Sequence, residues 1–160
     1  MSRKIYSRSA LLAKVKRLKA QKKKIVFTNG CFDVLHYGHV SYLRSAKKCG
    51  DFLVVGLNSD KSIRSIKGPT RPINAQRDRS EVLSELTCVD AVCLFNADTP
   101  YELIKAVKPD VLVKGADWKK EQIAGYDIVS AYGGKVRLIR LLPGRSSTHT
   151  IKKIGLSEGK

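Results

Sequence analysis

Two histidines, His36 and His39, lie three positions apart in a segment that joins a short apolar run to an expected helix. Gly30 stands in the turn before them, and a glycine allows backbone N–H groups to approach a ligand closely. The N-terminus of the following helix favours an anion. Imidazole N–H groups can stabilise the negative charge that builds on a phosphate in a transition state. This segment therefore predicts a site for phosphate chemistry.

A metal site is an alternative for this histidine pair, because a cysteine is nearby. No third ligand stands at a recognisable spacing, so we do not expect the protein to hold a metal ion with its own side chains. The cysteines are irregularly spaced and form no C-x-x-C pair, which argues against a zinc ribbon and against a disulfide framework. We expect reduced, mostly buried thiols at Cys31, Cys49, Cys88 and Cys93.

Basic residues are dense further along the chain, where residues 61–79 contain six Lys/Arg and a single opposing acid, Asp78. This density suits a flexible loop that gathers phosphate charge, and a solvated basic loop is the alternative. Ser147 and Thr148 are expected to open the last helix, where hydroxyl and N–H groups hold phosphates or simply cap the helix.

Apolar runs typical of strands alternate with helical segments, which predicts an α/β fold with a parallel sheet covered on both faces. Strands are expected at 24–28, 52–58, 91–95, 110–113 and 136–140. Helices are expected after caps at Ser9, Asn74 and Asp98, at 38–48 and 121–131, and from 147, with a basic loop at 61–73. Ligands of such folds sit beyond the carboxyl ends of the strands, where the histidines fall.

Length and composition fit one domain with a hydrophobic core, since the chain has 160 residues of which 42% are hydrophobic. No apolar run approaches the roughly 20 residues of a membrane span, and no signal peptide is evident, so we expect a cytoplasmic protein. The net charge is +17, and residues 1–24 contain 10 Lys/Arg and no acid. A solvated helix face explains this charge more often than nucleic-acid binding does. We expect a single domain, 1–160, in which 1–23 form a basic helical extension.

The order Gly30-x-Phe32-Asp33 and His36-x-Gly38-His39 resembles the cytidylyltransferase-like nucleotidyltransferases, which share the HIGH signature with class I tRNA synthetases. A chain of 160 residues leaves no room for tRNA-binding domains, so the smaller members remain. Further positions follow the family's order across residues 24–154: Lys67-Gly68, Arg71-Pro72, Arg79, Asp98–Pro100, Leu112–Asp117 and Arg145–Thr148. The resemblance implies a Rossmann-like fold with helices on both faces of a parallel sheet.

The resemblance also implies roles for individual residues. Catalytic contacts with phosphates fall to His36, His39, Lys67 and Arg79. Nucleotide contacts fall to Thr28, Asn29, Gly30, Cys31, Phe32, Asp33, Gly38, Lys114, Gly115, Asp117, Arg145, Ser146, Ser147 and Thr148. Contacts with the second substrate fall to Asn58, Arg71 and Trp118.

Among the family's activities, the motifs are most similar to those of members that transfer AMP from ATP to D-glycero-β-D-manno-heptose 1-phosphate for lipopolysaccharide core synthesis. The resemblance implies Mg²⁺ with ATP, small-molecule substrates, a homo-oligomer and no membrane or nucleic-acid partner. One alternative is a related enzyme that uses CTP with glycerol 3-phosphate or ATP with FMN. A second alternative is a basic nucleic-acid-binding module on an inactive nucleotide fold.

Overall fold

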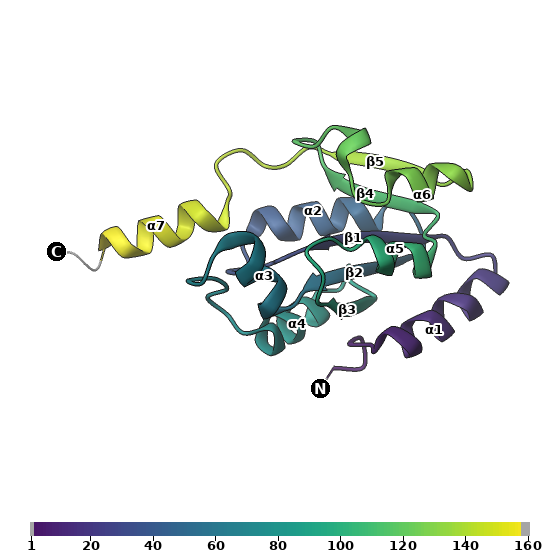
Figure 1. The fold of residues 1–160 in the computed structure, drawn as a ribbon, viewed down its shortest axis with the longest axis horizontal. Coiled ribbons are helices and arrows are strands. Elements are labelled where there is room, and N and C mark those ends of the chain that lie inside the picture. Colours follow the sequence, from purple (N-terminus) through teal and green to yellow (C-terminus); the bar gives the residue numbers. More distant parts are fainter. Residues whose placement is uncertain (1, 158–160) are drawn as a thin grey trace.

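A five-stranded parallel sheet forms the centre of the protein in a computed structural model, which describes residues 2–157. The strand order is β3-β2-β1-β4-β5, so the chain starts in the middle and winds outward in both directions (Figure 1). All neighbouring strands pair in parallel. The strands are β1 Ile25–Gly30, β2 Phe52–Asn58, β3 Ala91–Phe95, β4 Val111–Gly115 and β5 Lys135–Ile139. The expected α/β class and Rossmann-like topology are confirmed.

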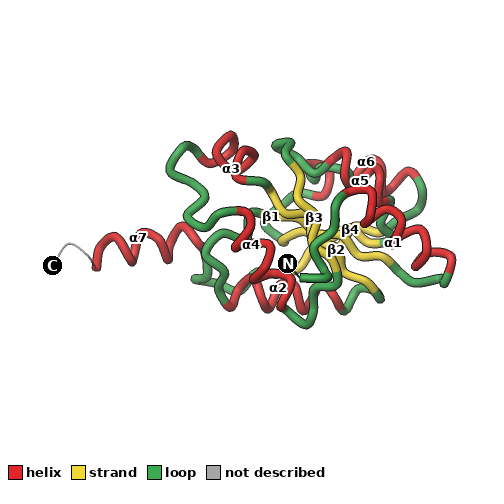
Figure 2. The backbone as a smooth tube through the Cα atoms, turned by 90° about the horizontal axis from the view of Figure 1, so that it is seen from below, coloured by secondary structure: helices red, strands yellow, loops and turns green. Residues whose placement is uncertain are grey.

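The central strands are buried on both faces, where two apolar clusters pack them against helices. One cluster joins Phe27 and Leu112 of the sheet to α1 Arg8–Ala20, α5 Tyr101–Val107 and α6 Tyr126–Ala131. The other cluster joins Val55 and Val113 to α2 Tyr37–Lys47 and α4 Gln76–Glu85. Figure 2 shows these two groups of helices on opposite sides of the strands. This burial explains why the strand sequences read as continuous apolar runs.

The basic N-terminal helix is packed on the sheet instead of extending from it. Leu11 and Val15 of α1 are 0% and 3% exposed and belong to the first cluster. The helix begins two residues earlier than expected, because Ser7 is the N-cap and its hydroxyl accepts from the N–H of Ala10 at 3.3 Å. Ser9 lies inside the first turn.

The segment expected to be a basic loop contains a helix, α3 Asp60–Lys67. Ser59 caps it by accepting from the N–H of Ser62 at 3.2 Å, and Ile63 is fully buried. Its many charged residues lie on the exposed side and obscured the short apolar side in the sequence. The loop is therefore limited to 68–75, after which α4 begins with Ala75 as its N-cap instead of Asn74.

The remaining elements follow the expected order with different bounds. The N-cap of α5 is Pro100, not Asp98. The helix expected at 121–131 is divided into a 3-10 turn, η1 Lys120–Gln122, and α6, because Gly125 between them has a φ of 88°. Helix α7 Ser147–Ser157 begins as expected and extends away from the sheet (Figure 1). Within residues 2–157 no helix is long and apolar enough to cross a bilayer.

Candidate active site

A cavity of about 310 Å³ opens at the carboxyl ends of β1 and β4, between the start of α2 and the start of α7. Most of the residues predicted for the site line it: Asn29, Gly30, Phe32, His36, Gly38, His39, Lys67, Lys114, Gly115, Asp117, Trp118, Arg145, Ser146, Ser147 and Thr148. Segments from distant parts of the sequence thus meet where parallel-sheet proteins bind ligands.

Three further residues, which the motif analysis did not predict, also line the cavity: Tyr42, Leu141 and Leu142. Tyr42 follows His36 and His39 at the same three-residue spacing, so helical periodicity alone could have indicated it. The adjacent leucines lie in the loop before α7 and are 44% and 36% exposed. Two consecutive leucines in a loop could have indicated that this segment lines a binding cavity with apolar side chains.

The two histidine rings stack on each other at the start of α2. Their centroids are 3.8 Å apart with an interplanar angle of 24°, and the Phe32 ring meets His39 edge-on at 5.4 Å. The turn that delivers them is strained, because Phe32 and Val34 have positive φ values of 44° and 53°. Non-glycine residues adopt this conformation at a cost of about 1–3 kcal/mol each, most often at functional sites.

The protonation of His39 is determined by its neighbours. Its Nδ1 accepts a hydrogen bond from the backbone N–H of His36 at 3.2 Å, which leaves the ring proton on Nε2. Burial, together with the nearby His36 and Lys67, lowers the pKa of His39 to about 4. Burial and Arg145 also lower the pKa of His36. Both rings are therefore neutral at pH 7 before a ligand binds.

Both ring nitrogens of His36 are buried and have no hydrogen-bond partner among the described residues. Buried polar groups of this kind cost about 1–3 kcal/mol when they stay unpaired, so the site favours a ligand that pairs with them. A phosphate oxygen is a suitable partner for an imidazole N–H.

Gly38 allows the segment before α7 to approach the histidines. A Cβ at this position would lie 2.9 Å from Arg145 Cβ and 2.9 Å from His36 Cε1. A larger residue would therefore push α7 away from the cavity. Ser146 caps α7 by accepting from the N–H of His149 at 3.1 Å, and His149 itself is exposed.

Asp33 joins three segments of the site without lining the cavity. Its carboxylate accepts from the N–H groups of Ile73 and Asn74 at 2.8 and 2.9 Å and pairs with Arg71 at 2.8 Å. Its carbonyl accepts from the Ser147 hydroxyl at 2.6 Å. Burial alone would raise the pKa of Asp33, but these donors together hold it below its usual value. The predicted nucleotide contact of Asp33 does not fit this geometry, because its oxygens are used by the protein.

Arg79 also lies outside the cavity, and its predicted contact with phosphate does not fit its surroundings. It is 3% exposed, and Nη1 donates to the carbonyls of Cys31 and Asn58 at 2.7 and 2.9 Å. Nε donates to Asn74 O at 3.0 Å, and Nη2 pairs with Asp60 at 2.8 Å. Its guanidinium therefore fixes the loops that surround the site.

The other predicted residues outside the cavity lining are also held by the protein. Thr28 is fully buried, and its hydroxyl lies 2.8 Å from that of Tyr42, which donates to Val113 O at 3.2 Å. Asn58 is 3% exposed and donates to Ser62 at 2.9 Å. Cys31 is half-buried, and burial raises the pKa of its thiol against the opposing effect of nearby cations.

The thiols of all four cysteines are free. Among residues 2–157, no group of three or more His, Cys, Asp or Glu side chains is arranged to hold a metal ion. The charged side chains that line the cavity are mainly cationic, with Asp117 as the acid among them. This donor set suits a ligand that carries several phosphates.

The fold is a Rossmann-like parallel sheet, and two stacked histidines lie beyond the carboxyl end of β1. They line a cationic cavity together with the start of α7. These features together define the class of nucleotidyltransferases. The chain belongs to the Cytidylyltransferase-like family, whose model matches residues 27–152. This membership confirms the resemblance seen in the sequence.

The chain is also similar to parts of longer curated proteins, of which it covers 31%. The chain is 53% identical over 150 residues to the bifunctional protein HldE of Wolinella succinogenes and 50% identical over 151 residues to that of Methylobacillus flagellatus. Each alignment covers 94% of this chain and 31% of the relative, so the chain spans about a third of the length of these proteins.

Solved structures show the same fold. The lipopolysaccharide core biosynthesis protein of Thermoplasma volcanium superposes with a TM-score of 0.61 at 32% identity, over 75% of this chain and 97% of that one. Pantoate-beta-alanine ligase of Francisella tularensis superposes with the same TM-score at 17% identity, over 96% of this chain and 77% of that one. The second likeness concerns the fold alone.

Proposed function

We propose that the protein transfers the AMP moiety of ATP to D-glycero-β-D-manno-heptose 1-phosphate, giving ADP-heptose and pyrophosphate for lipopolysaccharide core synthesis. The observation that carries this proposal is the pair of stacked histidines, which line a cavity whose charged side chains are mainly cationic. The identity of about 50% to bifunctional HldE proteins supports the choice of acceptor.

The reaction is an in-line displacement at the α-phosphorus. An oxygen of the acceptor's phosphate forms a bond to that phosphorus, while the bond to the β-phosphate oxygen breaks and pyrophosphate leaves. The attacking oxygen is already an anion near neutral pH, so no protein group has to remove a proton. The protein's task is to bring two anions together and to stabilise the charge of the transition state.

The histidines act on the reacting phosphate. His39 donates from Nε2 to a non-bridging oxygen of the α-phosphate, because Nδ1 is occupied by the His36 N–H. His36 donates from its unpaired ring to the same group. Both rings bind more strongly as negative charge develops, which is the condition for lowering the barrier.

The start of α7 receives the leaving pyrophosphate in this proposal. Arg145 supplies charge, and the hydroxyls of Ser146 and Thr148 together with the first N–H groups of the helix supply hydrogen bonds. Magnesium, when bound to the triphosphate, would neutralise part of its charge. It would be held mainly by phosphate oxygens and water.

Pyrophosphate release tests this function. ATP and CTP are each combined with D-glycero-β-D-manno-heptose 1-phosphate, glycerol 3-phosphate or FMN in the presence of magnesium. We expect turnover with ATP and the heptose phosphate. Turnover with another pair would replace the proposed substrates and keep the chemistry, and no turnover with any pair would contradict the proposal.

A further inference from the structure

The floor of the cavity is built from two neighbouring strands. The paired register of β1 and β4 ends at Phe27↔Leu112, and Asn29 and Lys114 each lie two residues beyond it on their strands. Phe27 and Leu112 both belong to the cluster under α1 and α5, and side chains alternate along a strand. Asn29 and Lys114 therefore lie on that same face of the sheet, and both line the cavity.

Asn29 carries an unsatisfied hydrogen-bonding atom. Its Oδ1 is buried and has no partner among the described residues. The atom can only accept a hydrogen bond, so the partner that completes it is an N–H or O–H group. Leaving such an atom unpaired is costly, and a ligand with a suitably placed hydroxyl removes this cost.

Lys114 supplies an ammonium group in the same cavity. Its Nζ lies 5.5 Å from the ring centroid of Trp118, and Trp118 is 47% exposed. Within residues 2–157, no carboxylate oxygen comes within ion-pair distance of this Nζ. A partly buried cation without a close ion pair is stabilised when an anion pairs with it.

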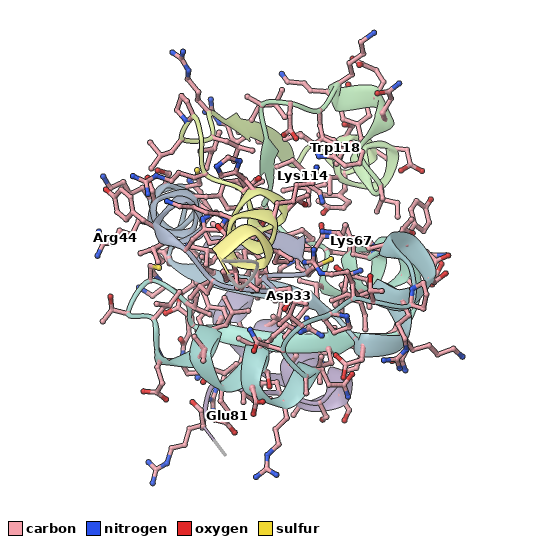
Figure 3. All side chains as sticks on the ribbon, turned by 90° about the vertical axis from the view of Figure 1, so that its left-hand side faces the viewer. Asp33, Arg44, Lys67, Glu81, Lys114 and Trp118 are labelled. Carbon is pink, nitrogen blue, oxygen red and sulfur yellow. The ribbon has the colours of Figure 1, made fainter. Side chains whose placement is uncertain are left out.

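The in-line geometry decides which substrate lies here. The attacking oxygen and the leaving pyrophosphate must lie on opposite sides of the α-phosphorus. The leaving group is assigned to the start of α7, so the acceptor approaches from the other wall. In Figure 3, Lys114, Trp118 and Lys67 lie on one side of α7 and Arg44 on the other, and the first three line the cavity.

We propose that Asn29 and Lys114 form the subsite for the acceptor instead of contacting the nucleotide. Lys114 binds the acceptor's phosphate, and Asn29 Oδ1 accepts a hydrogen bond from a hydroxyl of the sugar. The exposed ring of Trp118 covers the sugar. This inference rests on the proposed function, and it defines the acceptor chemically as a phosphate ester with a hydroxyl close to the phosphate.

Steady-state kinetics of two variants test the assignment. Asn29→Leu removes the acceptor atom with little change of volume, and Lys114→Met removes the charge while keeping the length. We expect the KM for heptose 1-phosphate to rise about 10-fold in the first and about 100-fold in the second, the losses typical of a neutral and a charge-assisted hydrogen bond. The KM for ATP should stay within about twofold in both.

Asn96→Leu and Lys105→Met are the matched controls, because both residues are exposed and lie outside the cavity lining. Neither KM should change in these controls. Binding of α,β-methylene ATP, measured by calorimetry, shows whether the variants still form the nucleotide site. A rise in the KM for ATP with an unchanged KM for the acceptor would overturn the assignment while leaving the proposed function intact.

Deoxy analogues of the acceptor provide a second test, whose first part needs only the unaltered protein. With the unaltered protein, one deoxy sugar 1-phosphate of the series should bind about 10-fold more weakly than the parent sugar. That analogue should lose no further affinity in Asn29→Leu. Equal binding of every analogue by the unaltered protein would overturn the role of Asn29. Absence of turnover with the parent acceptor would instead refute the proposed function on which the assignment rests.

Discussion

At the scale of residues, the histidine pair depends on protonation as much as on position. The His36 N–H holds His39 in the tautomer whose Nε2 carries the proton, and burial keeps the ring neutral near pH 7. The neutral ring donates a hydrogen bond from Nε2. Its hydrogen bond then strengthens as charge builds on the phosphate.

Replacement of His39 by alanine should lower kcat by about 10²–10³, the loss typical of removing one donor to a developing oxyanion. The KM for ATP should change much less, because the lost interaction is strongest in the transition state. Pyrophosphate release at saturating substrates measures this effect. Near-normal turnover of His39→Ala would refute the catalytic role.

The pH dependence should report Lys114. Burial lowers the pKa of its ammonium to about 8, while Asp117 and Cys31 nearby oppose this shift. Lys114 is charged below this pH and neutral above it, so kcat/KM for the acceptor should fall as the pH rises through about 8. In Lys114→Arg, whose guanidinium stays charged, the fall should move to higher pH. A fall at the same pH in both proteins would assign it to another group.

At the scale of elements, the alternation of strands and helices could be predicted because buried parallel strands read as apolar runs. The strand at 91–95 and the start of α7 were located to the residue. The sequence did not predict helix α3, because its charged residues outnumber the few apolar residues on its buried side. The cavity-lining residues of the HIGH segment followed from local sequence. The use of Asp33 and Arg79 as links between loops could not be predicted, because their partners lie 38 and 48 positions away.

Asp33→Asn tests the link between the turn before α2, the loop at 71–74 and α7. The carboxylate is 1% exposed and makes charge-assisted hydrogen bonds. Its loss should lower the free energy of unfolding by about 2 kcal/mol at pH 7. The pKa is lowered in the folded state, so this stabilisation is present above about pH 4 and is lost as the pH falls further.

Denaturant titrations of both proteins at several pH values measure this difference. The two stabilities should converge at the acid end of the range. A constant difference across the range would show that the effect comes from shape and not from the charge of Asp33.

At the scale of the whole molecule, the basic N-terminal segment has a structural role. Lys4 donates to Leu86 O at 3.1 Å, and Arg8 donates to Glu102 O at 3.0 Å. Lys19 donates to Lys108 O, the C-cap residue of α5. These contacts use part of the positive charge to satisfy the carbonyls of the C-cap residues of α4 and α5 and one carbonyl in the first turn of α5. These contacts favour a structural role for the basic residues of this segment over a role in nucleic-acid binding.

Leu11→Ala should therefore destabilise the whole protein. Leu11 is fully buried between α1 and the sheet, and such a truncation costs about 3 kcal/mol. Thermal unfolding should remain a single transition at a lower Tm. An unchanged Tm, or separate loss of one helix, would show that α1 is not part of the cooperative core.

The most direct test of the reaction follows the oxygens of the acceptor's phosphate. The protein is given ATP and heptose 1-phosphate labelled with ¹⁸O in its phosphate, and the products are analysed by mass spectrometry and ³¹P NMR. Attack on the α-phosphorus predicts that all of the label remains in ADP-heptose and that pyrophosphate carries none. Label in the released phosphate product, or formation of ADP and a sugar bisphosphate, would contradict adenylyl transfer.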